Sequence, residues 1–443
     1  MSGITLNTST ASSGSGIDVT SVVEQILYAE RAPERIWQRQ QQALAAQLGV
    51  LNGLQSGFQA LQDKIANLRD VSGALNALTA SSSQPSLLTA TAQPGSASGV
   101  HTLVIQNLAQ TASYYTDPIA SGTTLGNGTI TLQVGGVGHD IAIDSTRNTL
   151  DKLAAYVNTQ DFGVQASVIN DVDGARLALV SKTSGAAGDL NVTANTSELV
   201  FHKSVTGTDA NFTMDGVPLK SSSNTVTSVL PGVALTLLGQ DPNLPITLTI
   251  APDKDSAKQA LNDFVSAYNS LITAINTQFK VGTSSQEGSL SSNNSLRSLQ
   301  SSLLSNVTYA ISGNDGLVNL ASLGISMADD GTLSVNSSEL DAALSSNFAA
   351  VHSFFQGTDG FANHFYDALS KINSPTEGVI ALNLNENSAN TRAITDRIAD
   401  FEDRLVQRRQ FLINQYSAVD AMLRQYPLLL QQITSQIGTL SNS

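Results

Sequence analysis

The chain has 443 residues, a formal charge of -14, only 13% charged residues and no cysteine. At roughly 100–200 residues per domain this length predicts two to four folding units, and 41% hydrophobic residues are enough to form their cores. The shortage of basic residues argues against nucleic acid and against an anionic membrane surface as partners, because both select clustered Lys and Arg. The lack of cysteine excludes disulfides, thiolate nucleophiles and cysteine metal sites.

The N-terminal end has none of the features of a cleaved targeting segment. Residues 1–30 contain no Lys or Arg and no apolar core segment, so we expect no cleaved secretory signal. Residues 1–16 are instead rich in Ser, Thr and Gly, which fits either a frayed terminus or a leader that is kept after secretion. No apolar run reaches the ~20 residues of a membrane span.

The sequence predicts a helix over residues 19–79. Asp18 or Thr20 can cap its start, and Pro33 should break or kink it. From residue 44 onward the apolar residues follow heptad spacing, which is typical of a coiled-coil seam. Glycines at 49, 53, 57 and 73 weaken this helix by about 1 kcal/mol each relative to Ala, so the helix needs a partner. The predicted seam consists of Leu44, Leu51, Leu54, Phe58, Leu61, Ile65 and Leu68, with Leu75 continuing it.

Between residues 80 and 252 the apolar period changes to two, which predicts antiparallel strands joined as hairpins. The pairs Gly135-Gly136, Asp173-Gly174 and Asp215-Gly216 separate strands and accept positive φ. One helix at residues 150–157 interrupts the strands, because its apolar residues follow helical spacing. We expect strands at residues 99–109, 129–134, 140–143, 164–169, 176–181, 211–214, 233–238 and 246–250.

The helical period returns at Asp255 and gives one apolar face that extends to Phe279. The polar composition of residues 281–294 predicts a linker. Beyond the linker we expect helices at residues 295–310, 338–355 and 361–372, with a hairpin formed by residues 324–327 and 332–335.

The last sixty residues carry the strongest pattern in the chain. A stripe of fourteen positions from residue 394 to residue 440 alternates steps of four and three, and eleven of these positions are apolar. This repeat predicts coiled-coil packing. Pro427 should kink or break the helix and leave the final turns as a separate short segment. The apolar positions are Ile394, Ile398, Phe401, Leu405, Leu412, Val419, Met422, Tyr426, Leu429, Ile433 and Leu440.

The residues suggest no catalytic, cofactor-binding or metal site. None of the five histidines belongs to an H-E-x-x-H motif, and neither a G-x-S-x-G elbow nor a P-loop occurs. Asp171-Val-Asp173-Gly174 resembles the start of a calcium loop, but Lys182 stands where such a loop needs Glu. We interpret this stretch as a hairpin turn.

Several stretches resemble one family, in the family's own order and over nearly the whole chain. They are Gly14-Ser-Gly-Ile-Asp18 with Ala32-Pro33, Leu103-Val-Ile-Gln-Asn-Leu-Ala-Gln110, Asp209-Ala-Asn-Phe-Thr-Met-Asp-Gly216, Phe264-Val-Ser-Ala-Tyr-Asn-Ser-Leu271, and Leu323-Gly-Ile-Ser with Asp330-Gly-Thr-Leu-Ser-Val335. By these stretches the chain resembles the bacterial flagellar filament cap proteins, also called hook-associated protein two.

The resemblance implies a structural protein without enzymatic activity or cofactor. Members of this family are exported through the secretion channel of the flagellum and form a ring at the distal tip of the filament. The ring prevents loss of exported flagellin and promotes its folding and polymerisation. The implied partners are further copies of the chain, flagellin, hook–filament junction proteins and an export chaperone before secretion. The terminal helices are expected to be flexible in the free protein and ordered in the assembly.

The expected fold is multidomain α+β. A coiled-coil-like helical stalk built from both chain ends should carry an inserted antiparallel all-β region of two small domains. The expected divisions are a flexible segment at 1–43, a stalk at 44–80 plus 253–393, a first β domain at 81–112 plus 205–252, a second β domain at 113–204 inserted in the first, and a C-terminal coiled-coil segment at 394–443.

Two alternatives to a cap remain at this stage. An adhesin would place a sugar or receptor site on the β region, where Tyr114-Tyr115 on a loop is the aromatic pair that could serve. A rod-like hook or junction subunit would also have terminal heptads, although the β-region stretches argue against it.

Overall fold

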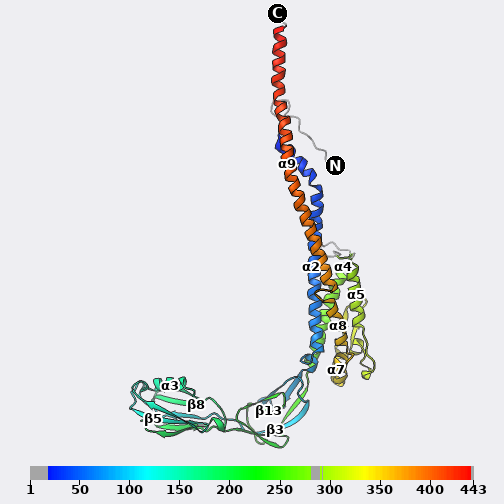
Figure 1. Cartoon of the computed structure of the whole chain (residues 1–443). Coiled ribbons are helices and arrows are strands. Elements are labelled where there is room, and N and C mark those ends of the chain that lie inside the picture. The colour runs from blue at the N-terminus through cyan, green and yellow to red at the C-terminus, as the bar shows by residue number, and fades with distance from the viewer. Residues whose placement is uncertain (1–17, 281–289, 292, 441–443) are drawn as a thin grey trace. The chain divides into compact units, whose positions relative to one another are not determined.

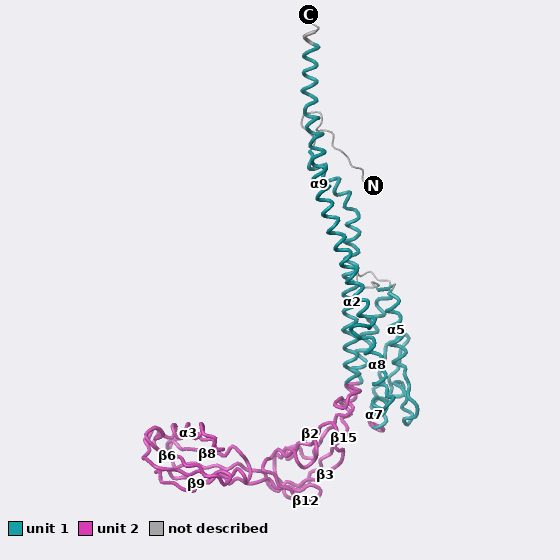
Figure 2. The backbone as a smooth tube through the Cα atoms, in the orientation of Figure 1, with its two compact units in different colours: residues 1–66, 261–343, 349–443 teal, residues 67–260, 344–348 magenta. Residues whose placement is uncertain are grey.

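The structure is a computed structural model that describes residues 18–280, 290–291 and 293–440 (Figure 1). The chain divides into two compact units (Figure 2). Unit 1 comprises residues 1–66, 261–343 and 349–443, and unit 2 comprises residues 67–260 and 344–348. Each unit is therefore assembled from segments that are distant in the sequence.

Helices supply most of unit 1. An aromatic cluster forms its core, in which Phe264 meets Phe361 and Phe365 edge to face at ring-centroid distances of 5.9 and 5.6 Å. A short hairpin of β16 (Ile325–Met327) and β17 (Leu333–Val335) completes the unit. The helices of the described chain outside the β region are α1 (Val19–Glu30), α2 (Ala32–Arg69), α4 (Lys254–Phe279), α5 (Asn294–Val307), α6 (Ser337–Ser346), α7 (Phe348–Gln356), α8 (Phe361–Ile372) and α9 (Val379–Leu440).

Antiparallel strands and one helix, α3 (Leu150–Thr159), make up most of unit 2. The strands are β1 (Leu78–Ser82), β2 (Leu88–Ala92), β3 (Gly99–Asn107), β4 (Ser113–Thr116), β5 (Gly128–Val134), β6 (Val137–Ile143), β7 (Val164–Asp171), β8 (Gly174–Ser181), β9 (Leu190–Asn195), β10 (Phe201–Val205), β11 (Ala210–Met214), β12 (Val217–Ser221), β13 (Thr225–Leu230), β14 (Val233–Leu237) and β15 (Ile246–Pro252). Antiparallel sheets in the middle and long helices at both ends confirm the expected α+β class.

Unit 2 contains two separate hydrophobic cores. The first core lies between the sheet β1-β15-β3-β11-β12 and the sheet β13-β14-β2. The second core lies between the sheet β10-β4-β8-β7, the sheet β6-β5-β9 and α3. Its strands follow β3 and precede β11 in the chain, so the sequence of the second core is inserted into that of the first.

The predicted hairpin turns at residues 135–136 and 215–216 are confirmed, since each lies between two paired strands. The turn between β7 and β8 consists of residues 172–173, one residue earlier than predicted, because Gly174 already pairs as the first residue of β8. Asp215 and Gly216 have φ values of 51° and 82°, and they form a two-residue turn between β11 and β12. Positive φ at both central positions matches the right-handed twist of the flanking strands. This requirement explains why an Asp-Gly pair lies there.

Three helix predictions need correction. The helix predicted at 19–79 is broken at Arg31, close to the expected Pro33, but it ends at Arg69, and Leu75 lies in a short 3₁₀ helix instead. Pro427 does not end the C-terminal helix, because α9 continues through it to Leu440. Proline removes one amide donor, and the carbonyl left without it belongs to Leu423, a half-exposed residue that water can reach. The helix predicted at 338–355 is two helices, α6 and α7.

The sequence patterns also missed several short strands. The strands β1, β2, β4, β9, β10, β12 and β13 were not predicted, because most of them have few strongly apolar residues with which to set a period of two. Tyr114 and Tyr115 lie on β4 rather than on a loop. Most of the predicted polar linker, residues 281–289 and 292, lies outside the described residues.

Candidate functional site

The two ends of the chain meet where α1 packs antiparallel to α9. Val23 and Leu27 of α1 are buried against Leu405 and Leu412 of α9. The contact is small, but all four side chains are at most 5% exposed. Burial of one leucine stabilises a fold by roughly 1.5–3 kcal/mol, so this cluster alone can hold a twelve-residue helix in place.

Ion pairs flank this apolar cluster on both sides of α1. Arg409 donates to Glu24 at 2.8 Å, and Arg408 donates to Glu30 at 3.3 Å. Acidic side chains on α1 thus face basic side chains on α9. Because the partners are exposed, each pair contributes little energy, and together they fix the direction and register of the two helices.

Arg31, at the break between α1 and α2, binds both neighbouring helices. Its guanidinium donates to Glu34 of α2 at 2.7 Å and also donates to both carboxylate oxygens of Glu402 on α9, at 2.9 Å for Nη2. Glu34 is only 6% exposed and accepts a further bond from Gln38. The hydrogen bonds from Arg31 lower the pKa of Glu402, and the bond to Glu402 raises the pKa of Arg31.

Farther along, α2 itself runs antiparallel to α9. Trp37 packs on Phe401, and Gln41 donates to Thr395 at 3.1 Å. Asn387 then donates to the backbone carbonyl of Leu44 at 3.1 Å. As the residue numbers rise on α2 they fall on α9, so the helices at the two ends of the chain form one paired surface within unit 1.

The helices α4 and α8, rather than α9, cover the C-terminal part of α2. Gly57 permits a close approach, because a Cβ at this position would lie 3.0 Å from Leu271 Cδ1 of α4. Lys64 forms an ion pair with Asp263 of α4 at 2.8 Å, and Gln62 binds Ser370 of α8 at 2.8 Å. The seam of α2 is therefore shared among α9, α4 and α8 rather than paired with one helix.

The structure places the predicted seam residues in three environments. On α2, Leu44 is half-buried, and the other six residues from Leu51 to Leu68 are buried. On α9, Leu405 and Leu412 are buried, and Ile394, Ile398 and Phe401 are half-buried. Val419 and Met422 are 40% and 69% exposed. The side chain of Leu440 lies outside the described residues.

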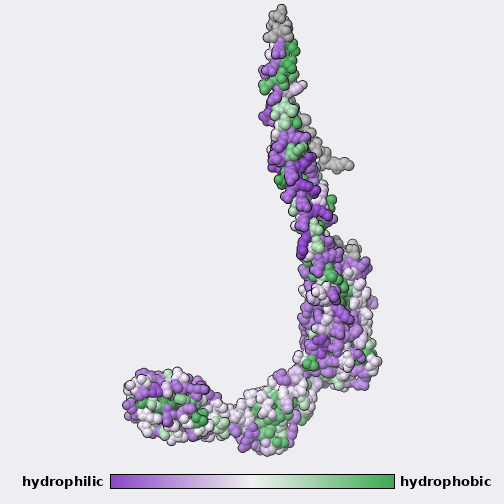
Figure 3. Space-filling view, in the orientation of Figure 1, coloured by the Kyte–Doolittle hydropathy of each residue, from purple (hydrophilic) through white to green (hydrophobic). Residues whose placement is uncertain are grey.

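The second half of the α9 stripe has no partner among the described residues. Figure 3 shows hydrophobic surface toward this end of α9. The exposed stripe consists of Val419, Met422, Tyr426, Leu429 and Ile433, with Leu423, Leu430 and Ile437 beside it, all between 40% and 69% exposed. Asp420 and Arg424 form an ion pair at 2.8 Å beside the first turns of this surface, and residues 425–443 contain no Asp, Glu, Lys or Arg.

Sequence reasoning missed the residues that cover the first half of the stripe. Val23 and Leu27 stand four residues apart on α1, a spacing that places them on one helix face. Glu24 and Glu30 on α1, set against Arg408 and Arg409 on α9, were a further signal of pairing. Neither Arg31 nor Trp37 was singled out, because a single charged or aromatic residue does not identify its partner.

The predicted adhesin pair has a mainly structural environment. Tyr114 packs against the second core of unit 2, while Tyr115 is 39% exposed and stacks on His202 at a centroid distance of 5.3 Å. Within the described residues there is no group of three or more His, Asp or Glu that could hold a metal ion. None of the helices among these residues is both long and apolar enough to cross a membrane.

Comparison with known families gives matches to both halves of the chain. The model described as flagellar hook-associated protein 2 C-terminus matches residues 207–427, and the model described as flagellar hook-associated protein 2 N-terminus matches residues 15–112. A third model, described as flagellin hook IN motif, matches residues 129–183, from β5 to the loop after β8.

Individual relatives match over most of their length. The B-type flagellar hook-associated protein 2 of Pseudomonas aeruginosa is 27% identical, with 89% of this chain and 90% of the relative covered. The flagellar hook-associated protein 2 of Escherichia coli K12 is also 27% identical, with 97% and 98% covered. The crystal structure of the D1-D2-D3 domains of the Escherichia coli flagellar cap protein FliD matches with a TM-score of 0.60 at 25% identity, with 76% of this chain and 99% of that chain covered.

Proposed function

Because the chain belongs to the flagellar hook-associated protein 2 family, we propose that it is the structural cap of a bacterial flagellar filament. A cap at the distal tip prevents the loss of exported flagellin and promotes its folding and polymerisation. The chain therefore acts in flagellum assembly and motility, at an extracellular site, by binding other proteins rather than by catalysis.

The observation that carries this proposal is the division of the α9 stripe into a covered and an uncovered half. Leu405 and Leu412 are buried against α1, whereas Met422 and Leu429 on the same stripe are 69% and 53% exposed. Contiguous apolar surface of this kind marks protein interaction sites. We infer that the covered half holds the two ends of one chain together and that the uncovered half binds other chains during assembly.

The composition of the uncovered half favours further copies of this chain as its partner. Residues 425–443 contain no charged side chain. Identical helices can therefore pack side by side here without repulsion between like charges, as copies in a ring would require. Flagellin, hook–filament junction proteins and an export chaperone are the further partners that we propose, with export by the secretion system of the flagellum.

The test is genetic and microscopic. Cells from which this chain is deleted should release flagellin into the medium and bear short filaments or none, and a plasmid copy of the chain should restore full-length filaments. Gold-labelled antibody against the chain should bind at filament tips. Full-length filaments on the deleted cells, or label along the filament or at its base, would contradict the proposal.

A further inference from the structure

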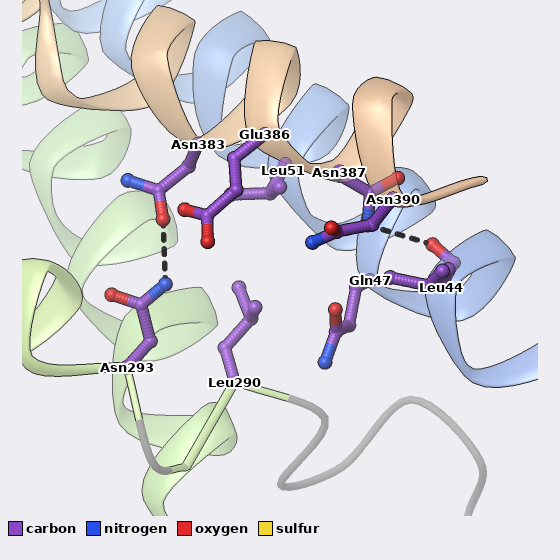
Figure 4. A pocket seen from close by; sticks show the side chains of 9 residues that line it. All are labelled: Leu44, Gln47, Leu51, Leu290, Asn293, Asn383, Glu386, Asn387 and Asn390. Atoms are coloured by element: carbon purple, nitrogen blue, oxygen red, sulfur yellow. Dashed lines mark hydrogen bonds between the residues drawn. The ribbon is translucent and has the colours of Figure 1, made fainter. Parts of the chain in front are cut away.

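A polar cavity of about 240 Å³ lies in unit 1 beside α9 (Figure 4). It is far larger than the ~30 Å³ that one water molecule occupies in the liquid. Apolar side chains of Leu44, Leu51 and Leu290 form part of its wall. The rest of the described wall consists of the amides of Gln47, Asn293, Asn383, Asn387 and Asn390 and the carboxylate of Glu386.

The charged acceptor of this cavity, the carboxylate of Glu386, is exposed. Asn387 also lies in the wall, but it is only 4% exposed, its Nδ2 binds the carbonyl of Leu44, and its Oδ1 is buried and has no surface that a partner could reach. The Glu386 side chain points into the cavity and makes no hydrogen bond or ion pair with any described residue. A carboxylate without a partner attracts a positive charge, and hydrogen bonds from a charged donor are among the strong ones. The cavity is therefore suited to a cationic hydrogen-bond donor.

A cation without a partner stands on the same helix. Arg392 of α9 is exposed and makes no hydrogen bond, ion pair or ring contact with any residue that the structure describes. The other arginines in the described ranges each make at least one such contact, as Arg397 does over the ring of Trp37. Arg392 is thus the arginine of α9 that is available to another chain.

Arg392 and the cavity lie on different faces of α9. At 3.6 residues per turn, Arg392 is between about 120° and 180° around the helix axis from Asn383, Glu386, Asn387 and Asn390. Its Cα is ~3 Å beyond that of Asn390 and ~9 Å beyond that of Glu386 along the axis. The cation and the carboxylate therefore cannot meet within one chain.

Complementary groups on two different faces of one molecule generate head-to-tail contacts, which close into a ring when the rotation permits. We propose that Arg392 of one copy inserts into the cavity of the adjacent copy and there donates hydrogen bonds to Glu386. This inference rests on the proposed function, because it requires copies of the chain to assemble side by side. Each copy supplies one arginine and one cavity, so a closed ring leaves none unpaired.

The chemistry favours arginine over lysine as the inserted side chain. A guanidinium carries five donors in a planar fork, which can bind a carboxylate through two parallel hydrogen bonds. A lysine ammonium is a more strongly hydrated point charge and lacks this geometry. The apolar wall at Leu44 and Leu290 suits the methylene stem of the arginine.

The experiment measures assembly of the full chain by sedimentation velocity over a series of concentrations. Arg392→Gln and Glu386→Gln should each raise the concentration needed for half-assembly about tenfold or more, because each leaves the other charge unpaired in the contact. Arg392→Lys should weaken assembly nearly as much. The exchange variant Glu386→Arg/Arg392→Glu should recover most of the loss. Arg404→Gln, which removes an exposed arginine more than three turns away on the same helix, is the matched control.

The outcomes separate this inference from the proposed function. If the wild-type chain does not assemble under any condition, the proposed function fails. If the wild-type chain assembles and the single variants do so equally well, the cavity holds water only and the inference is overturned. Weakened single variants whose exchange variant does not recover would also overturn it. Helix content and Trp37 fluorescence equal to the wild-type values show that a variant is folded.

Discussion

The indole of Trp37 on α2 packs edge to face against the ring of Phe401 on α9, with a centroid distance of 5.3 Å and an interplanar angle of 90°. Arg397 of α9 lies 5.7 Å from the centre of the same indole. Trp37 is the only tryptophan of the chain, so its fluorescence reports the pairing of α2 with α9 directly.

Phe401→Ala should loosen this pairing. The substitution removes a half-buried ring and an aromatic pair worth about 0.5–1.5 kcal/mol beyond the area that it buries. We expect the emission of Trp37 to shift to longer wavelength and to lose its protection from acrylamide quenching. Phe411→Ala is the control, because Phe411 is 58% exposed on the same helix. An unchanged emission maximum in Phe401→Ala would contradict the packing described here.

Two glycines of α2 should respond differently to the same substitution. A Cβ on Gly53 would meet no atom within 4 Å, so Gly53→Ala should stabilise unit 1 by about 0.5–1 kcal/mol through helix propensity. A Cβ on Gly57 would lie 3.0 Å from Leu271 Cδ1, and Leu271 is buried. Gly57→Ala should therefore lose most or all of this gain. Thermal unfolding measures both, and equal melting temperatures would refute the close approach of α2 to α4.

The sequence predicted the elements well wherever one local pattern determined them. Heptads on α2 and α9, the period of two in β14 with Val233, Leu235 and Leu237 buried, and turns such as Asp215-Gly216 all follow from residues close in the chain. The α+β class and the family resemblance were correct for this reason. The domain boundaries and the role of the seam residues in assembly remain predictions.

The errors share one physical cause, which is that tertiary partners do not appear in a local pattern. The seam predicted the buried face of α2 but could not indicate that α4 and α8 cover the C-terminal part of this helix. Pro427 is tolerated because the helix there is exposed, and exposure is a tertiary property. Asn387 lies one heptad before Ile394 but is polar, and Glu386 lies off the heptad positions, so the cavity that they line left no signal in the hydrophobic period.

The contact between Arg31 and Glu402 predicts how acid affects the docking of α1. The hydrogen bonds from Arg31 hold the pKa of Glu402 below its unfolded value, so Glu402 stabilises the folded state above that value. The contribution is lost as the pH falls through the lower pKa of the folded state. Between ~pH 5 and ~pH 2, hydrogen-exchange protection of α1 should therefore fall more in the wild-type chain than in Glu402→Gln.

The control for this acid effect is Asp403→Asn, which changes an exposed carboxylate next in the chain. Its protection should follow the wild-type curve. Parallel curves for the wild-type chain and Glu402→Gln would mean that the ion pair does not form in solution.

The covered half of the α9 stripe should be essential to the paired chain ends. Leu405→Asp with Leu412→Asp places two charges where side chains are 5% and 3% exposed, at a cost well above the roughly 1.5–3 kcal/mol of each lost leucine contact. We expect α1 to lose its hydrogen-exchange protection and capping to be abolished. The melting of unit 2 should not change. Arg404→Ala, which lies off the stripe, is the control, and normal swimming by cells with the double variant would contradict the assignment.

The uncovered half of the stripe should behave in the opposite way in the free chain. Met422→Asp with Leu429→Asp changes residues that are 69% and 53% exposed. The free energy of unfolding of the monomer should therefore stay within about 0.5 kcal/mol of the wild-type value, and α1 should keep its hydrogen-exchange protection. The same variant should fail to assemble, because two charges would have to be buried in every contact between neighbouring helices. Gln431→Asp adds a charge on the face away from the stripe and should assemble normally.

Sedimentation of the purified chains measures assembly, and the flagellin content of the culture medium measures capping. If the double variant assembles like the wild-type chain, the exposed stripe is not the contact surface. If instead the Met422 and Leu429 variant unfolds α1 as the Leu405 and Leu412 variant does, the two halves of the stripe form one intrachain core. The proposal that α9 has separate intrachain and interchain surfaces would then be wrong.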